Sequence, residues 1–281
     1  MTLEPAQNDS IYRKVTTGQS MKKDRILLFI PAYNCEDQIT RVLATLKGEI
    51  RDHIDEVIVI NNRSTDGTEQ AVLNFREEHS DLRLKLFRND DNYGLGGSQK
   101  VAFGYAVENG FDYVVMVHGD DQGNIWDFLP VFEKRIYRNY DCVLGARFMR
   151  GSRLEGYSVL RTFGNIVYDF LFAAAIKQRV FDLGSGLNMY DVSMLKDGFY
   201  LRFPDNLTFN YCMVLALQYY NQTCRFYPIS WRETDQVSNV KLSSQAVKVL
   251  RILFDYMDNP SSIRGEYRDR EIASYTYEEI G

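Results

Sequence analysis

Short apolar runs alternate with helix-like stretches through the first half of the chain, and this alternation constrains the fold more than any other feature. The apolar runs cover residues 26–30, 56–60 and 113–117, and a further strand is expected at about residues 82–87. The helix-like stretches between them cover residues 36–49, 68–78 and 98–109. Continuous apolar runs of this length are typical of parallel strands that are covered on both faces. The order of elements predicts an α/β fold, with a Rossmann-like, mostly parallel wound sheet and flanking helices.

The second half of the chain predicts a continuation of the same domain. Beyond about residue 145 the alternation weakens into amphipathic helices and one further strand at residues 225–229. No repeat, low-complexity run or linker separates the two halves, which favours a single domain over residues 24–242. Residues 1–23 are expected to be a flexible extension and residues 243–281 a helical tail.

Composition excludes several classes of protein. The formal net charge of −5 argues against a nucleic-acid partner. The four cysteines form no CxxC pair, so neither a zinc site nor a disulfide framework is expected, and a reducing cytoplasm is the simplest location. The longest apolar stretch in the middle of the chain, residues 170–176, is much shorter than the roughly 20 residues that cross a bilayer, so no spanning segment is expected.

Polar loops follow three of the predicted strands directly, at residues 31–34, 61–66 and 118–122. The carboxyl ends of parallel strands meet at one edge of a sheet, where ligands bind in such folds. We therefore expect these loops to converge on one site.

The loop at residues 118–122 has side chains suited to a divalent metal. His118, Asp120 and Gln122 alternate, so they point to one side if the segment is extended, and together they can hold Mg²⁺ or Mn²⁺. Asp121 then faces elsewhere or binds sugar hydroxyls. The alternative is a polar loop that caps the following helix.

Several motifs occur in an order that resembles family 2 glycosyltransferases. They are FIPAYN at 29–34 with Glu36, NNRSTDGT at 61–68, NYGLGG at 92–97, GDDQ at 119–122, GARF at 145–148, DLGSGL at 182–187, and Trp231-Arg232 followed by residues 238–241. The chain is most similar to the dolichol- and polyprenyl-phosphate sugar transferases, over about residues 25–242. The resemblance implies a GT-A fold, a nucleoside-diphosphate sugar as donor and a divalent metal.

The resemblance also implies which residues bind the donor. They are Pro31, Ala32, Tyr33, Asn34, Glu36, Asn61, Asn62, Gly94, Gly96, Asp120 and Asp121. Tyr33 offers a ring for stacking and Glu36 can accept ribose hydroxyls, although a strand-ending turn with a packed aromatic side chain also explains Pro31 and Tyr33. Small residues at Gly94 and Gly96 allow close backbone approach and expose amides that can meet an anion. Arg88 and Lys100 flank this turn and can either approach phosphate or be solvated surface charges.

Two departures from the family pattern leave details open. Asn61 and Asn62 stand where the family usually carries two aspartates, one of which accepts a hydrogen bond from a pyrimidine base. An amide both donates and accepts, so the identity of the base stays open. His118 stands in place of the usual first aspartate of the metal motif, and a neutral imidazole is a competent metal ligand.

The catalytic candidates are Asp120, Asp182, Arg147 and Arg232. Transfer to an alcohol needs a general base, for which Asp182 and Asp205 are the candidates, whereas transfer to a phosphate monoester needs none. Arg147, Arg161 and Arg232 can clamp phosphates, and the alternative is that they are ordinary surface residues.

The leading hypothesis is an inverting glycosyltransferase that transfers a sugar to polyprenyl phosphate or to a growing glycan. Residues 167–176 can form an apolar helix that faces a lipid acceptor or the inner face of the membrane, or else a core or dimer helix. A homo-oligomer is therefore also compatible with the sequence. The rival hypotheses are a nucleotidyltransferase and a non-catalytic protein that binds nucleotide sugars.

Overall fold

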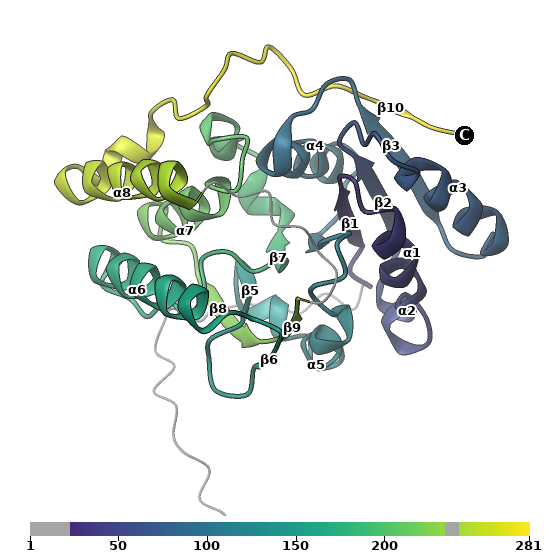
Figure 1. Ribbon diagram of the computed structural model, residues 1–281, viewed down its shortest axis with the longest axis horizontal. Coiled ribbons are helices and arrows are strands. Elements are labelled where there is room, and N and C mark those ends of the chain that lie inside the picture. The colour runs from purple at the N-terminus through teal and green to yellow at the C-terminus, as the bar shows by residue number, and fades with distance from the viewer. Residues whose placement is uncertain (1–22, 234–241) are drawn as a thin grey trace, which may run out of the picture.

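Eight strands form one central sheet in the computed structural model of the chain, which describes residues 23–233 and 242–281 (Figure 1). Across the sheet the order is β10-β3-β2-β1-β4-β7-β5-β8. These strands are β1 (Ile26–Ala32), β2 (Glu56–Asn61), β3 (Leu84–Asn89), β4 (Tyr113–Val117), β5 (Cys142–Ala146), β7 (Leu187–Asp191), β8 (Cys224–Pro228) and β10 (Tyr277–Glu279). Two short strands, β6 (Arg153–Glu155) and β9 (Ser230–Arg232), pair with each other beside the main sheet.

The predicted parallel sheet is confirmed in its central part. Strands β1 to β4 are parallel to one another, with Phe29 opposite Ile58 on one side and Met116 on the other. Antiparallel strands occur in the parts of the chain where strands and helices do not alternate regularly. Strand β7 lies antiparallel between β4 and β5, and β10 is antiparallel to β3 at the far edge.

Helices cover both faces of the sheet (Figure 1). They are α1 (Glu36–Ala44), α2 (Glu49–His53), α3 (Thr68–Glu78), α4 (Gly94–Glu108), α5 (Leu129–Glu133), α6 (Val159–Ile176), α7 (Phe209–Tyr219) and α8 (Leu242–Asp258). Helices α1, α2, α3 and α5 pack on one face, and α4 and α7 pack on the other, with α6 and α8 outside α7.

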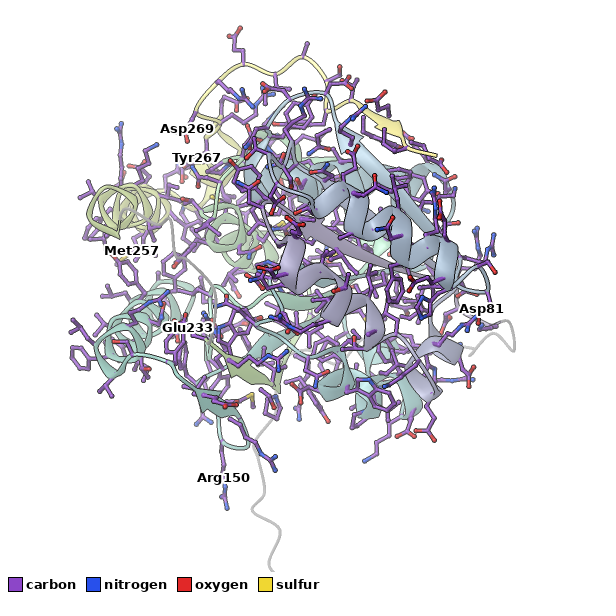
Figure 2. All side chains as sticks on the ribbon, turned by 45° about the vertical axis from the view of Figure 1, so that its right-hand side comes forward. Asp81, Arg150, Glu233, Met257, Tyr267 and Asp269 are labelled. Carbon is purple, nitrogen blue, oxygen red and sulfur yellow. The ribbon has the colours of Figure 1, made fainter. Side chains whose placement is uncertain are left out.

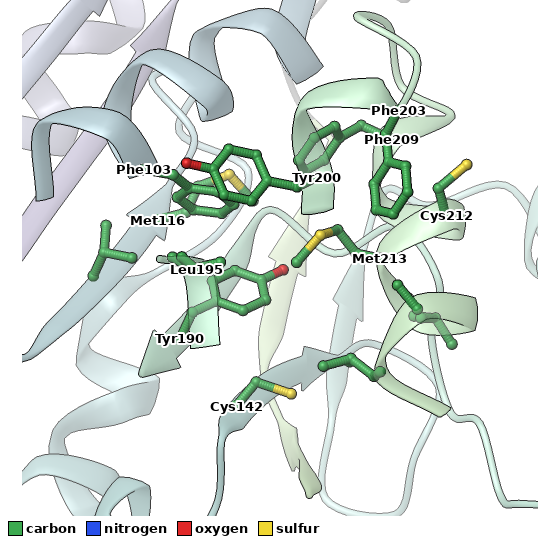
Figure 3. Close-up of a cluster of buried hydrophobic side chains, with 14 of the residues drawn as sticks. Phe103, Met116, Cys142, Tyr190, Leu195, Tyr200, Phe203, Phe209, Cys212 and Met213 are labelled. Carbon is green, nitrogen blue, oxygen red and sulfur yellow. The ribbon is translucent and has the colours of Figure 1, made fainter. Parts of the chain in front are cut away.

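Alternate residues of each central strand supply the two cores. In β1, Leu27 and Phe29 face α4 and α7, whereas Ile26, Leu28 and Ile30 face α1 and α5. Because both faces are buried, the strand sequence is apolar throughout. Figure 3 shows the α4–α7 core, where the ring of Phe103 meets Tyr190 edge to face, with the ring centroids 5.3 Å apart.

Two predicted helices differ from the structure. The stretch at residues 36–49 is two helices, because the chain turns at Gly48, whose φ of 55° favours glycine and interrupts the helix. The predicted helical tail at residues 243–281 is an α-helix only to Asp258. A 3₁₀ turn at Pro260–Arg264 follows it, and an extended segment then leads to β10.

The C-terminal segment is joined to the domain by a buried lysine. Lys100 of α4 is fully buried, and its Nζ donates to the Phe203 carbonyl at 2.5 Å, to Asp205 Oδ1 at 2.7 Å and to the Tyr275 hydroxyl at 2.9 Å. The Tyr275 hydroxyl also donates to Asp205 at 2.6 Å. Burial lowers the pKa of Lys100 although Asp205 opposes that shift. Lys100 is therefore neither a phosphate ligand nor a solvated surface charge.

Replacing Lys100 by methionine is expected to lower the free energy of unfolding by about 3 kcal/mol, because the Asp205 carboxylate loses its buried partner. Urea denaturation measures the change. The matched control is Lys248→Met, which breaks an ion pair with Asp269 whose two side chains are about half exposed, and should cost less than about 1 kcal/mol. Equal losses for the two variants would contradict this account.

Candidate active site

Loops at the carboxyl ends of β1, β2 and β4 meet at one edge of the sheet. The Asn62 N–H donates to the Ala32 carbonyl at 2.9 Å, and the Gly119 N–H donates to the Pro31 carbonyl at 3.1 Å. Together with residues 92–98 and Leu207, these loops surround a cavity of about 350 Å³, which we call the rim pocket. Its lining includes several predicted site residues, namely Pro31, Ala32, Tyr33, Asn62, Gly94, His118 and Asp120.

The backbone holds the amide of Asn62 in one orientation. Asn62 Oδ1 accepts hydrogen bonds from the Tyr93 N–H at 2.8 Å and from Asn89 Nδ2 at 2.9 Å. Asn62 Nδ2 donates to Asn92 Oδ1 at 2.8 Å, and the same oxygen accepts from the Gly94 N–H at 3.0 Å. A backbone N–H can only donate, so these two bonds fix which end of each amide is the oxygen.

Three residues that were predicted to bind the nucleotide-sugar donor, Asn34, Glu36 and Asn61, do not line the rim pocket. Asn34 Oδ1 accepts from the Thr65 N–H at 2.8 Å, and Glu36 Oε2 accepts from the Gly67 N–H at 2.9 Å. Asn61 is buried, and its Nδ2 donates to Glu69 at 2.8 Å. These side chains hold the loops after β1 and β2 together.

The amide of Gly96 is not open to an anion as the sequence suggested. The N–H groups of Gly96 and Gly97 donate to the Asp205 carbonyl at 2.7 and 3.2 Å. A Cβ atom at Gly96 would lie 2.5 Å from the Pro204 carbonyl oxygen, so glycine is needed here for close approach of two backbones. Gly94, with a φ of 69°, stays in the lining of the rim pocket.

The predicted metal residues lie on a turn, because Asp121 adopts a φ of 61° and the segment is not extended. The side chain of Asp120 is 37% exposed, and its Oδ2 lies 3.9 Å from His118 Nδ1. Burial lowers the pKa of His118, so its imidazole is neutral, and its buried Nε2 has no hydrogen-bond partner within residues 23–233 and 242–281. The N–H of Gln122 donates to Asp120 Oδ1 at 3.2 Å.

This donor set fits a divalent ion that is shared with a ligand. The Asp120 carboxylate and the neutral His118 imidazole, which line the rim pocket, are suitable metal-binding groups, whereas Gln122 is not in that lining. Mg²⁺ commonly takes its remaining ligands from water and substrate phosphates. Among the described residues, no cluster of three or more His, Cys, Asp or Glu side chains could enclose a metal ion alone. The arrangement therefore fits an ion whose coordination is completed by a bound phosphate.

Asp121 and Arg232 pair with each other. The Asp121 carboxylate is buried and accepts from Arg41 Nε at 2.7 Å and from Arg232, whose Nε also donates to the Asp121 carbonyl at 2.9 Å. Asp121 is thus held away from the rim pocket by two arginines.

Arg147 and Asp182, both predicted as catalytic, form a buried ion pair. Asp182 Oδ2 accepts from Arg147 Nε at 2.7 Å and from its backbone N–H at 2.9 Å, while Oδ1 accepts from Nη2 and from the Gly184 N–H. Every lone pair of the Asp182 carboxylate is used, so it is not available as a general base. Asp205, the other candidate base, is committed to Lys100 and Tyr275.

A second cavity of about 350 Å³ lies between Arg147 and helices α6 and α8, and we call it the helix pocket. Leu95, His118 and Leu207 line both pockets, so the two cavities adjoin. The nitrogen of Arg147 that Asp182 does not engage, Nη1, is 3.5 Å from the Tyr157 hydroxyl in this lining. The described residues that line the helix pocket include no carboxylate.

Asp169 of α6 is the one carboxyl group near this pair with a strongly raised pKa. It is buried, and burial followed by the charge of Asp182 raises its pKa to about 8. The group is therefore mostly protonated at neutral pH, and it is not among the residues that line the helix pocket.

Helices α6 and α8 leave apolar side chains on the outside of the protein. Those of α6 are Val159, Leu160, Phe163, Ile166, Val167 and Phe170, and those of α8 are Val247, Phe254 and Met257. Figure 2 shows Met257 on the outer side of α8. The apolar segment is longer than the seven residues counted at 170–176. Helix α6 has 18 residues, and by length and composition alone it could cross a membrane. Most of its residues are not buried in the protein.

The family model for glycosyl transferase family 2 matches residues 28–199, which is more than half of the chain. This chain belongs to glycosyl transferase family 2. Two curated relatives act on lipid phosphates by name. One is the UDP-N-acetylglucosamine–dolichyl-phosphate N-acetylglucosaminyltransferase of Methanococcus voltae, 25% identical over 61% of this chain and 71% of that protein. The other is the undecaprenyl-phosphate mannosyltransferase of Micrococcus luteus, 27% identical over 60% of this chain and 63% of that protein.

Solved structures of glycosyltransferases have the same fold. Glucosyl-3-phosphoglycerate synthase from Mycobacterium tuberculosis aligns over 84% of this chain and 80% of its own, with a TM-score of 0.60 and 16% identity. TarS from S. aureus aligns over 86% of this chain and 71% of its own, with a TM-score of 0.54 and 19% identity. The family 2 glycosyltransferase described here is thus a GT-A enzyme.

Some pocket residues were not predicted from the sequence. Asn92 lies within a motif quoted above, but only the glycines of that motif were given roles. Tyr157, Asn210 and Tyr211 line the helix pocket and come from a loop and a helix that only tertiary packing brings to Arg147. Residues 238–241, part of the last motif, lie outside the described residues.

Proposed function

We propose that this family 2 glycosyltransferase transfers a sugar, with inversion, from a nucleoside-diphosphate sugar to a polyprenyl phosphate. The observation that carries this proposal is that the rim pocket adjoins a helix pocket in which Arg147 is present and carboxylates are absent from the described lining. The first pocket suits the donor and the second suits a phosphate with an apolar tail.

The rim pocket has groups for both ends of the donor. Tyr33, which is 47% exposed, offers its ring to a base, and Asp120 lies where the diphosphate would be held. Asp120, Gln122 and His118 would hold Mg²⁺ or Mn²⁺. When bound, the metal neutralises charge on the diphosphate leaving group.

The helix pocket suits an acceptor that is already anionic. An alcohol acceptor, including a growing glycan, needs a base to remove its proton. Asp182 has no lone pair left for a proton, and Asp205 lines neither the rim pocket nor the helix pocket, so neither can do this. A phosphate monoester needs no base, and Arg147 Nη1, which Asp182 does not engage, can hold one of its oxygens.

The reaction then balances without a proton transfer from the protein. An oxygen of the acceptor phosphate forms a bond to the anomeric carbon from the side opposite the diphosphate. The bond between that carbon and the diphosphate oxygen breaks, and the diphosphate leaves with the electron pair. His118 lines both pockets and would therefore lie beside the carbon that is transferred.

The acceptor's hydrocarbon chain fits the outer surface of the enzyme. Leu160 and Tyr168 of α6 line the helix pocket, and the exposed apolar side chains of the same helix continue outward from it. We propose that this surface rests on the cytoplasmic face of a membrane that contains the acceptor, as an interfacial contact. The names of the two curated relatives agree with a lipid-phosphate acceptor.

A transfer assay tests the proposal, with nucleotide sugars, Mn²⁺ and vesicles that contain either a polyprenyl phosphate or the corresponding polyprenol. We expect sugar to enter the phosphate-containing lipid only. Asp120→Asn should reduce the rate by about a hundredfold or more, because the weakened site no longer holds the metal ion that neutralises charge on the leaving diphosphate. Asp37→Asn, the same change on the exposed first turn of α1, should leave the rate unchanged.

Two results would contradict the proposal. Transfer to the polyprenol or to a soluble oligosaccharide, with none to the phosphate, would show that the acceptor is an alcohol. Full activity of Asp120→Asn would show that the rim pocket does not hold the reacting diphosphate.

The membrane contact is tested by Phe163→Ser combined with Phe170→Ser, since these rings are 65% and 71% exposed on α6. Loss of two aromatic rings that the proposed contact would bury in the membrane should weaken binding to vesicles by about tenfold or more. Sedimentation with vesicles measures this. Leu201→Ser, a change at an exposed apolar side chain outside α6 and α8, is the control. Unchanged vesicle binding of the double variant would contradict the membrane contact.

A further inference from the structure

We infer that the rim pocket selects a base that presents an acceptor ring nitrogen at its pairing edge, as cytosine and adenine do. Uracil, thymine and guanine present an N–H at the same place and should bind less well. The inference rests on the proposed function, because it takes the rim pocket as the site of a nucleotide.

The sheet places the base near Asn62. Asp120 follows β4 and Asn62 follows β2, with β1 between them. Neighbouring strands are about 4.8 Å apart, so the two loops are separated by roughly 10 Å. A diphosphate at Asp120 therefore puts the base at the end of the pocket lined by Asn62 and Asn92, beside the exposed ring of Tyr33.

The amide oxygens of Asn62 and Asn92 cannot accept a further hydrogen bond, and Ser98, whose Oγ accepts from Asn89 Nδ2 at 3.1 Å, is fully buried. Asn62 Oδ1 already accepts from the Tyr93 N–H and from Asn89 Nδ2. Asn92 Oδ1 already accepts from the Gly94 N–H and from Asn62 Nδ2. An amide oxygen has two lone pairs, so both oxygens are saturated.

The side-chain nitrogens, in contrast, retain hydrogens to donate. Asn62 Nδ2 uses one hydrogen for Asn92, and within the described chain its second has no acceptor. Asn92 Nδ2 donates to no described residue, and Asn92 is exposed in the pocket lining. These amides therefore offer N–H groups to the base. A ring nitrogen that accepts is paired there, whereas the N–H of uracil or guanine is left without a partner.

Isothermal titration of the full chain with CDP, ADP, UDP, TDP and GDP, each with Mn²⁺, tests the inference. We expect CDP or ADP to bind about tenfold more tightly than the other three nucleotides. The comparison of CDP with ADP identifies which acceptor-edged base is preferred. Tighter binding of UDP, TDP or GDP would overturn the inference and leave the proposed function standing, whereas no binding by any of the five would overturn both.

Asn92→Asp gives a second test at an exposed position. One carboxylate oxygen of the new aspartate can keep the bonds from the Gly94 N–H and from Asn62 Nδ2. The other oxygen takes the place of Asn92 Nδ2, so an acceptor replaces a donor. The ratio of UDP to CDP affinity, or to ADP affinity if that base is preferred, should rise by about tenfold. Asn124→Asp adds the same charge at an exposed helix cap outside the pocket lining and should leave that ratio unchanged. An equal change of the ratio in both variants would overturn the inference.

Discussion

The parallel pairing of β1 with β2 and β4 is the constraint on which the site depends. Strands that run in one direction end at one edge, so the loops that follow them meet without any special sequence to bring them together. Two backbone hydrogen bonds, from Asn62 to Ala32 and from Gly119 to Pro31, hold these loops in place. The rim pocket is therefore a property of the sheet, and its side chains decide what it binds.

The same structure limits the chemistry by occupying its carboxylates. Asp182 positions Arg147, Asp205 joins α4 to the C-terminal segment, and Asp121 is held by two arginines. Among the carboxylates predicted for the site, Asp120 is the one that lines the rim pocket, and none lines the helix pocket. A site with a diphosphate end and a cationic acceptor end, but without an available carboxylate base, suits transfer of a sugar from a diphosphate to a phosphate. The exposed apolar surface of α6 suits an acceptor that carries a hydrocarbon chain.

Strands β1, β2 and β4 were predictable because each is buried on both faces and its sequence is therefore almost continuously apolar. The antiparallel strands β7 and β10 were not, since they depend on contacts between segments far apart in the chain. Motifs located the rim pocket, and Tyr33, Asn62 and Asp120 line it as a set. The sequence could not show that Arg147 and Asp182 form a buried ion pair. Two residues 35 positions apart can be two separate catalytic groups or partners of each other, and only the fold distinguishes these cases. The length of the apolar surface of α6 was also missed, because polar residues interrupt its sequence but not its outer face.

Anomalous diffraction from crystals grown with Mn²⁺ and a nucleoside diphosphate that binds would locate the metal and the nucleotide together. We expect a manganese peak within about 2.5 Å of an Asp120 carboxylate oxygen, with the diphosphate on the same ion and the base between Tyr33 and Asn62. A nucleotide in the cavity of about 460 Å³ between α8 and the C-terminal segment would contradict this expectation. A nucleotide in the rim pocket with manganese remote from Asp120 would contradict it equally.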